Sequence, residues 1–180
     1  NTLYKIVVLT PASLKMNFFS ELKKCGDLLF KKNQYWEFVS IEGKPENVEI
    51  LHKTLNISRE YIRKKKGAWM VNINKQPNFS TLKSEDQDKV DHQLNEMIRV
   101  KYMDLNYNGL NMKALERITG KFSRNPFDNC VLVIDEAHNF VSRIINKLNK
   151  KKSLSYMLYD YIMNAQNAKV ILLSGTPIIN

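Results

Sequence analysis

Residues 131–138 read Val-Leu-Val-Ile-Asp-Glu-Ala-His, and this stretch decides the fold class. The apolar, mostly β-branched run predicts a buried strand, and two adjacent carboxylates, Asp135 and Glu136, follow it directly. In parallel α/β sheets, ligands lie beside the carboxyl ends of the strands. The stretch therefore predicts a parallel strand that delivers two carboxylates to the sheet edge, as a magnesium-nucleotide site requires. An acidic first turn of a helix is the structural alternative.

A second apolar run ends in a similar way, because residues 170–177 read Val-Ile-Leu-Leu-Ser-Gly-Thr-Pro. The hydroxyls of Ser174 and Thr176, on either side of Gly175, are expected to hydrogen-bond a carboxylate or histidine across the sheet edge. His138 lies three residues beyond Asp135, so on a helix it returns to the same side. An ordinary strand exit punctuated by Gly and Pro, and a histidine that satisfies a loop carbonyl, are the alternatives.

Strands and helices alternate along both ends of the chain. A strand is predicted at Lys5–Thr10, a helix from Leu14 to Cys25 and a second strand at Tyr35–Ile41, which together form the unit of a parallel sheet. A further strand is predicted at Tyr102–Tyr107, and Ser153 is expected to cap a helix before the second apolar run. The fold class is therefore α/β, with a mainly parallel sheet flanked by helices.

The segment from Glu46 to Lys101 has a different character and is interpreted as a charged, partly helical insertion. Residues 48–66 form a basic helical stretch, and residues 69–73 form a short extended one. Ser84 with Gln87 matches a capping box. The helix that follows has one apolar face, formed by Val90, Leu94, Met97 and Ile98.

Composition limits the class of protein. The chain has 180 residues, a net charge of +10 and 43% hydrophobic residues, which favours one folded domain with a polyanionic partner. No apolar run approaches the roughly 18–20 residues of a membrane span, so no membrane partner is expected. Cys25 and Cys130 are far apart in sequence, which favours an intracellular location over a disulfide framework. Both ends of the chain lie close to motifs, which predicts a fragment of a larger protein.

Two further strand ends are candidates for binding a nucleic-acid backbone. Thr10, Pro11 and Ser13 close the first strand and open a helix, whose N-terminal N–H groups suit phosphate. Asn108 and Gly109 form a turn that could present N–H groups in the same way. A capped helix start and a simple turn are the alternatives.

One motif is absent from the sequence. A phosphate-cradling loop needs G-x-x-x-x-G-K-[ST], and neither Gly-Lys pair, at residues 43–44 and 120–121, fits that pattern. The chain therefore lacks the lysine and hydroxyl that hold the β- and γ-phosphates, and by itself it is not expected to hydrolyse ATP.

The motifs and their order resemble the first RecA-like domain of superfamily-two helicases and translocases, a P-loop NTPase fold. Residues 10–13 resemble motif Ia, Asn108-Gly109 falls near motif Ib, residues 135–138 match the DEAH form of motif II, and residues 174–176 match motif III. Residues 172–180 are closest to the Swi/Snf-type version. Segments at 69–72, 93–98 and 105–109 also resemble helicase-like ATPases of large nucleocytoplasmic DNA viruses, including poxvirus-type early transcription ATPases.

The resemblance implies that residues 1–180 are part of a first motor domain that uses ATP and Mg²⁺. It implies that Asp135 holds magnesium through water, that Glu136 activates the attacking water, and that His138, Ser174 and Thr176 couple the nucleotide to nucleic acid. The implied partners are nucleic acid, with DNA favoured over RNA, and a second RecA-like domain of the same parent chain.

The resemblance also implies a location in the virion or the infected cell. A non-catalytic nucleic-acid-binding or transcription scaffold, and a restriction-type translocating subunit, remain as alternatives.

Overall fold

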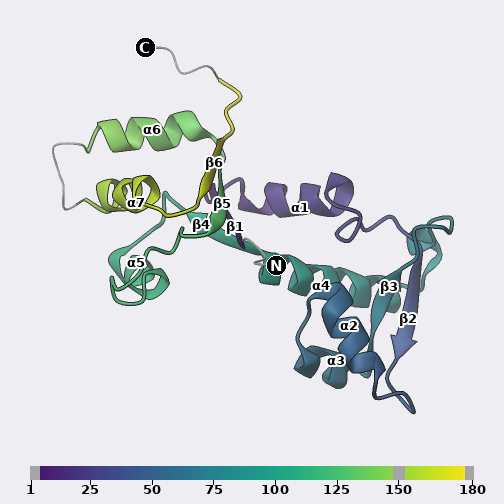
Figure 1. Ribbon diagram of the computed structural model, residues 1–180. Coiled ribbons are helices and arrows are strands. Elements are labelled where there is room, and N and C mark those ends of the chain that lie inside the picture. The colour runs from purple at the N-terminus through teal and green to yellow at the C-terminus, as the bar shows by residue number, and fades with distance from the viewer. Residues whose placement is uncertain (1–4, 148–152, 177–180) are drawn as a thin grey trace. The chain divides into compact units, whose positions relative to one another are not determined.

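The computed structural model describes residues 5–147 and 153–176 and divides into two compact units (Figure 1). Residues 1–15 and 102–180 form one, here called the sheet unit, and residues 16–101 form the other, called the middle unit. Helix α1 and strand β2 thus group with the segment 46–101 that the sequence marks as an insertion. The basic run at 150–152 and the residues from Pro177 onward lie outside the described residues.

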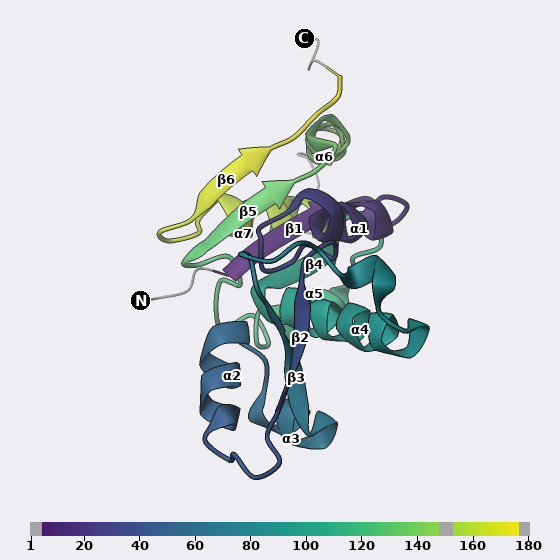
Figure 2. The same ribbon diagram turned by 90° about the vertical axis from the view of Figure 1, so that its right-hand side faces the viewer.

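The sheet unit is built on four parallel strands. These are β1 (Lys5–Thr10), β4 (Tyr102–Asn106), β5 (Cys130–Ile134) and β6 (Lys169–Leu172), in the order β4-β1-β5-β6 (Figure 2). The α/β class with a parallel sheet is therefore confirmed. Its helices are α5 (Met112–Ile118), α6 (Ala137–Ile145) and α7 (Leu154–Met163).

Alternating strand residues supply the core of this unit. One face of the sheet packs against the apolar sides of α6 and α7, so that Phe140, Ile144, Leu158 and Ile162 meet Val7, Leu9, Leu132 and Ile134. Full burial of one such side chain contributes about 1.5–3 kcal/mol relative to exposure. Helix α7 begins as predicted, because the Ser153 side chain accepts a hydrogen bond from the Tyr156 N–H.

The strand register brings the carboxyl ends of the strands to one edge. Leu9 in β1 lies opposite both Leu105 in β4 and Ile134 in β5, and Ile134 lies opposite Leu172 in β6. The residues that follow these positions therefore emerge along the same edge of the sheet. That edge holds every site residue predicted from the sequence.

Strand β6 differs from the other three strands in its exposure. All four of its residues are exposed, and Val170, Ile171 and Leu172 keep about half of their surface open, at 46%, 46% and 55%. Among the described residues, β6 pairs with β5 alone, so its other backbone edge is unpaired. A strand this apolar is typical of a sheet interior and not of a solvated edge.

The middle unit is mostly helical. Its elements are α1 (Lys15–Cys25), β2 (Trp36–Ser40), α2 (Asn47–Leu55), α3 (Arg59–Lys65), β3 (Gly67–Val71), the 3-10 turn η1 (Phe79–Thr81) and α4 (Ser84–Lys101). The predicted apolar face of α4 is confirmed, because Val90, Leu94, Met97 and Ile98 are all buried.

The prediction that residues 35–41 belong to a parallel sheet is wrong. Strand β2 pairs with β3 in a separate antiparallel sheet, with Trp36 opposite Val71. The physical reason lies in its composition, since parallel strands covered on both faces are continuously apolar. Strand β2 instead carries Glu37 and Ser40, and of its five residues Trp36 alone is buried.

Two local predictions in the middle unit also need correction. The basic stretch 48–66 is two helices, because Asn56 adopts a left-handed conformation that ends α2 and Ser58 then caps α3. The capping box at Ser84 does not form. Ser84 is already helical, and the Gln87 side chain donates to the Leu82 carbonyl instead of returning to the Ser84 N–H.

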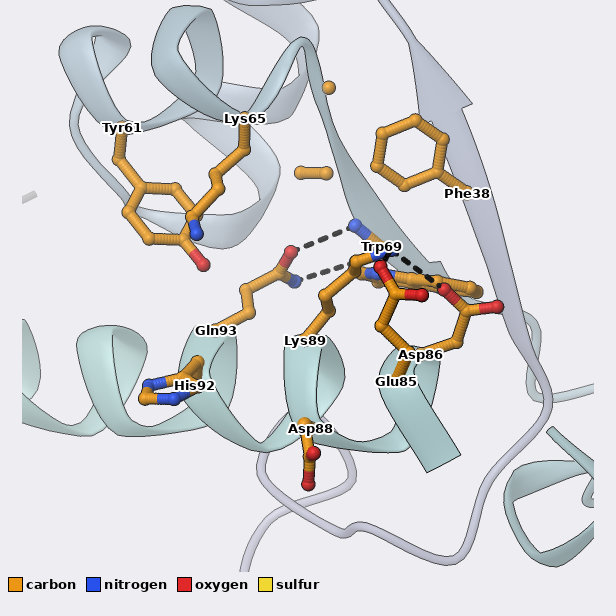
Figure 3. Close-up of a pocket in the computed structure, with 12 residues that line it drawn as sticks. Phe38, Tyr61, Lys65, Trp69, Glu85, Asp86, Asp88, Lys89, His92 and Gln93 are labelled. Atoms are coloured by element: carbon orange, nitrogen blue, oxygen red, sulfur yellow. Dashed lines mark hydrogen bonds and ion pairs between the residues drawn. The ribbon is translucent and has the colours of Figure 1, made fainter. Parts of the chain in front are cut away.

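A buried glutamine joins α4 to strand β3. The Gln93 amide accepts from the Trp69 N–H at 2.8 Å and donates to the Trp69 carbonyl at 2.7 Å, as a neighbouring strand would (Figure 3). Both residues line a cavity of about 540 Å³ whose other walls carry Phe38, Tyr61 and Lys89. Trp69 itself is buried.

In the described part of the chain, none of the helices combines the length and apolar character that crossing a membrane requires.

Candidate active site

Asp135 and Glu136 stand where strand β5 ends and helix α6 begins. The Asp135 N–H donates to the Leu9 carbonyl at 2.9 Å, which extends the β1–β5 ladder by one residue. The Ala137 N–H donates to the Leu173 carbonyl at 2.8 Å and ties the start of α6 to the end of β6. The backbone that carries the two carboxylates is thus held by hydrogen bonds to the ends of β1 and β6.

Glu136 has a left-handed backbone, with φ of 50° and ψ of 49°. This conformation costs a non-glycine residue about 1 kcal/mol or more, and such residues cluster at functional sites. The Tyr107 hydroxyl lies 3.3 Å from the Asp135 carbonyl and 3.4 Å from the Glu136 carbonyl, and donates toward both. Tyr107 therefore braces the strained backbone from the end of β4.

Tyr107 is itself perturbed by this position. Burial, together with the neighbouring Asp135 and Glu136 charges, raises the pKa of the Tyr107 hydroxyl from 10 to about 12. The ring packs edge-on against the ring of Phe140, with the two centroids 5.4 Å apart. The hydroxyl remains a proton donor at any physiological pH, which is the form that binding two carbonyls requires.

His138 joins the two predicted strand ends. Its Nδ1 lies 2.9 Å from Ser174 Oγ, 3.0 Å from Thr176 Oγ1 and 3.3 Å from Glu136 Oε2. The Ser174 hydroxyl donates its single proton to the Thr176 carbonyl at 2.6 Å. Ser174 Oγ can therefore only accept from the histidine, which places a hydrogen on His138 Nδ1. One N–H thus bridges the Glu136 carboxylate and the hydroxyls around Gly175.

The carboxylates fit a magnesium ion that is shared with phosphates. In the described residues no group of three or more His, Cys, Asp or Glu side chains is arranged to hold a metal. Magnesium in nucleotide sites is bound through one or two carboxylates, waters and substrate phosphates, so a dedicated cluster is not required. One oxygen of Asp135 accepts the Glu136 N–H at 3.0 Å, and its second oxygen is available.

The residues predicted at the end of β1 lie at the same edge. Thr10 is 1% exposed, and its hydroxyl is buried without a hydrogen-bond partner in the described part of the chain. Pro11 is buried, and its carbonyl accepts from the Leu14 N–H in the turn before α1. Ser13 is exposed. Of these three residues, Ser13 is the one whose side chain faces solvent.

Asn108 and Gly109, at the end of β4, are both exposed. The Asn108 N–H is already taken, because it donates to the Asn106 side chain at 2.9 Å. The Asn108 side chain accepts from Arg143 Nη1 at 2.9 Å, and the same nitrogen donates to the Tyr107 carbonyl at 2.9 Å. Arg143 in α6 therefore holds the turn that contains Asn108 and Gly109.

Tyr107 and Arg143 are the residues that sequence reasoning misses. It places Tyr107 only at the end of a strand, and it assigns no role to Arg143. One feature of the sequence could have drawn attention to Arg143. It is the basic residue in the last turn of α6, the helix that starts at the two carboxylates. The contacts themselves depend on the β4–β1–β5 strand order, which local sequence does not encode.

Comparisons with known proteins give partial matches. A "Termination factor NPH-I homolog" of African swine fever virus, in tick and warthog isolates, is 44% identical over 50 residues, which cover 28% of this chain and 7% of the relative. A "Putative ATP-dependent RNA helicase" of Acanthamoeba polyphaga mimivirus is 38% identical over 53 residues, or 27% of this chain and 6% of the relative. No protein-family model and no solved structure matches the chain.

The chain spans less than a tenth of the length of the curated relatives it matches. Over about a quarter of its own length, the chain is thus similar to superfamily-two helicase-like proteins of viruses.

Proposed function

We propose that this chain is part of the ATPase core of a nucleic-acid-dependent helicase or translocase. The observation that carries the proposal is the bridge from His138 Nδ1 to Glu136, Ser174 and Thr176. It joins a carboxylate suited to activating water with a second strand end that has no catalytic group of its own. Such a link is what coupling between hydrolysis and movement needs.

The chain's own residues have distinct roles in this proposal. Glu136 orients and deprotonates the water that attacks the γ-phosphate of ATP, and its position is fixed by its backbone conformation and by Tyr107. Asp135 holds magnesium, which when bound neutralises charge on the phosphates. The hydrogen bonds of His138 Nδ1 change with the state of the Glu136 carboxylate. His138 thereby couples that carboxylate to Ser174, Gly175 and Thr176.

Nucleic acid is proposed to bind along the same edge, at the segment of Thr10, Pro11 and Ser13, where Ser13 is the exposed residue, and at Asn108 and Gly109. The Arg143 bridge supports this arrangement, because it ties the Asn108 side chain to the helix that begins at Glu136. The net charge of +10 favours a polyanion. DNA is the favoured form.

The phosphate-binding loop and a second RecA-like domain are proposed to come from other parts of the parent protein. Strand β6 supports this, because its exposed apolar side chains and unpaired edge suit a further parallel strand. The lysine of the phosphate-binding loop, which the described residues do not supply, would then lie beside Ser174.

The test is the nucleic-acid-stimulated ATPase rate of the full-length parent with Glu136→Gln. Loss of a general base is expected to lower kcat by roughly 10²–10⁴-fold while leaving nucleic-acid binding intact. Glu116→Gln, in α5 and outside the site, is the matched control and is expected to keep the wild-type rate. Full activity of Glu136→Gln would refute the proposal, and a wild-type parent that binds DNA without hydrolysing ATP would support the scaffold alternative.

A further inference from the structure

A cavity of the sheet unit lies beside the Asn108 turn. Its volume is about 230 Å³, and its polar lining comes from Asn108, Arg143, Lys147, Ser153 and Ser155. Phe140 and Leu158 form part of its apolar wall. It lies between the end of β4, helix α6 and the start of α7, and it shares Asn108 with the proposed nucleic-acid site.

The charged side chains described in the lining of this cavity are all positive. Among its described lining residues two are cations and none is acidic. Arg143 uses both hydrogens of Nη1 on the Tyr107 carbonyl and the Asn108 side chain, which leaves its Nε and Nη2 hydrogens without partners in the described part of the chain. Lys147 is exposed and has no described carboxylate partner. The cavity therefore offers charged donors to an anion.

The size of the cavity limits the ligand. Pockets for whole small molecules measure roughly 300–1,000 Å³, so this one suits a single charged group with a small apolar neighbour. A phosphate with its adjoining sugar has that composition. Arginine forks and lysine ammonium groups are the usual partners of phosphate oxygens.

We propose that this cavity binds one backbone phosphate of nucleic acid, through Arg143 and Lys147. The proposal rests on the proposed function, since it extends the nucleic-acid path from Asn108 and Gly109 onto helix α6. Arg143 also contacts Tyr107, whose hydroxyl reaches the Glu136 carbonyl. A phosphate bound to Arg143 would thus be linked through Tyr107 to the backbone of Glu136. Arg143 would act as a positioning residue.

The experiment compares Lys147→Gln with Lys113→Gln by fluorescence anisotropy, with a labelled DNA duplex and a range of salt concentrations. Both lysines are exposed cations of the sheet unit without a described carboxylate partner, but Lys113 lies in α5, outside the cavity. Loss of a charged phosphate contact is expected to weaken binding by Lys147→Gln roughly tenfold. The slope of log Kd against log salt should fall by about 0.9 for the lost phosphate. Lys113→Gln should change Kd less than about twofold.

Ser155→Asp gives a second variant, because it places a carboxylate in the cavity lining without removing a contact of the core. It is expected to weaken DNA binding at least as much as Lys147→Gln. Equal effects of Lys147→Gln and Lys113→Gln would overturn the proposal and show that overall charge alone is responsible. Binding of inorganic phosphate that depends on Lys147, without any Lys147-dependent DNA binding, would overturn it as well.

Failure of the cavity proposal can be distinguished from failure of the proposed function. If Lys147→Gln and Ser155→Asp both bind DNA like the wild type, the cavity proposal fails while the Glu136→Gln test keeps its meaning. If the wild-type chain binds no DNA, the cavity proposal and the proposed nucleic-acid site fail together.

Discussion

The sheet unit and the middle unit differ in how many of their cations form ion pairs. In the middle unit, eight lysine and arginine side chains form ion pairs, namely Lys23 and Lys32 with Asp91, Lys24 with Glu21, Arg59 with Glu49, Lys66 with Glu42, Lys75 with Glu37, Lys89 with Glu85 and Arg99 with Glu96. The other cations of this unit have no described carboxylate partner, namely Lys31, Lys44, Lys53, Arg63, Lys64, Lys65, Lys83 and Lys101. In the described part of the sheet unit, the cations lack carboxylate partners, namely Lys5, Lys113, Arg117, Lys121, Arg124, Arg143, Lys147 and Lys169.

Ion pairing lowers the number of middle-unit cations that can attract a polyanion. Paired charges cancel beyond a short distance, whereas unpaired cations release counterions when a phosphate backbone binds. The polar side chains of the two units also differ in where they lie. Gln93 of the middle unit holds two elements of the fold together, whereas Asp135, Glu136 and Ser13 of the sheet unit lie at an accessible edge.

The largest expected effect tests the claim that the sheet unit depends on its apolar core. Leu132 is fully buried, and Leu132→Ala is expected to lower the free energy of unfolding by about 2–5 kcal/mol. Urea unfolding followed by far-ultraviolet circular dichroism measures this. Leu172→Ala, in the adjacent exposed strand, is the control and is expected to cost much less. Equal costs would show that β6 is buried in solution.

The next effect tests whether a polar group stabilises the middle unit. Gln93→Ala leaves the buried Trp69 N–H and carbonyl without partners, and is expected to cost roughly 1–3 kcal/mol. Tryptophan fluorescence during urea unfolding reports on it, because both tryptophans, Trp36 and Trp69, lie in this unit. Gln87→Ala, on the same helix, removes a side chain that donates to the Leu82 carbonyl and serves for comparison. If Gln93→Ala left the free energy of unfolding unchanged, the stabilising role of Gln93 would be wrong.

A matched pair of lysines compares the two units directly. Lys23 contacts both oxygens of Asp91, at 2.9 and 3.0 Å, and Lys23→Gln is expected to destabilise the chain by about 1 kcal/mol at low salt. Lys113→Gln is expected to stay within about 0.5 kcal/mol of the wild type. Thermal unfolding at low and high salt measures both variants. If Lys113→Gln were the costlier one, the contrast between the units would be wrong.

Asp91 supplies the pH dependence of this pair. Burial opposes ionisation of the Asp91 carboxyl, but Lys32 and Lys23 outweigh it and hold its pKa below 3.8. The group therefore stabilises the fold above pH 3.8, and this contribution is lost as the pH falls below that value. The stability difference between the wild type and Asp91→Asn should accordingly shrink in acid.

The smallest effect at neutral pH concerns Tyr107. Its hydroxyl contacts are long, so Tyr107→Phe is expected to cost about 0.5 kcal/mol at neutral pH. The raised pKa means that this group stabilises the fold below pH 10 and that the contribution is lost as the pH rises from 10 to about 12. The wild type should therefore lose stability faster than Tyr107→Phe in that range. Parallel pH profiles of urea unfolding for the two proteins would show that the hydroxyl is not buried.

Much of the fold can be predicted because its signals are local. The apolar runs that end at Ile134 and Leu173 specify strands, and the polar residues after them specify the edge. Residues 35–41 cannot be assigned in the same way, since a short apolar segment fits either sheet. Its antiparallel partner, β3, is fixed by packing around Trp36 and Trp69.

By itself, the sequence predicted which residues are candidates for the chemistry, and it determined that they follow strand ends. Strand ends of a parallel sheet share one edge, so these residues were expected to form one group, namely Asp135, Glu136, His138, Ser174 and Thr176. Only the tertiary structure decided that Tyr107 braces Glu136, that Arg143 holds Asn108, and that a cation-lined cavity lies beside them. The physical reason is that hydrogen bonds between residues about 30 positions apart depend on strand order and register, which arise from the packing of the whole sheet.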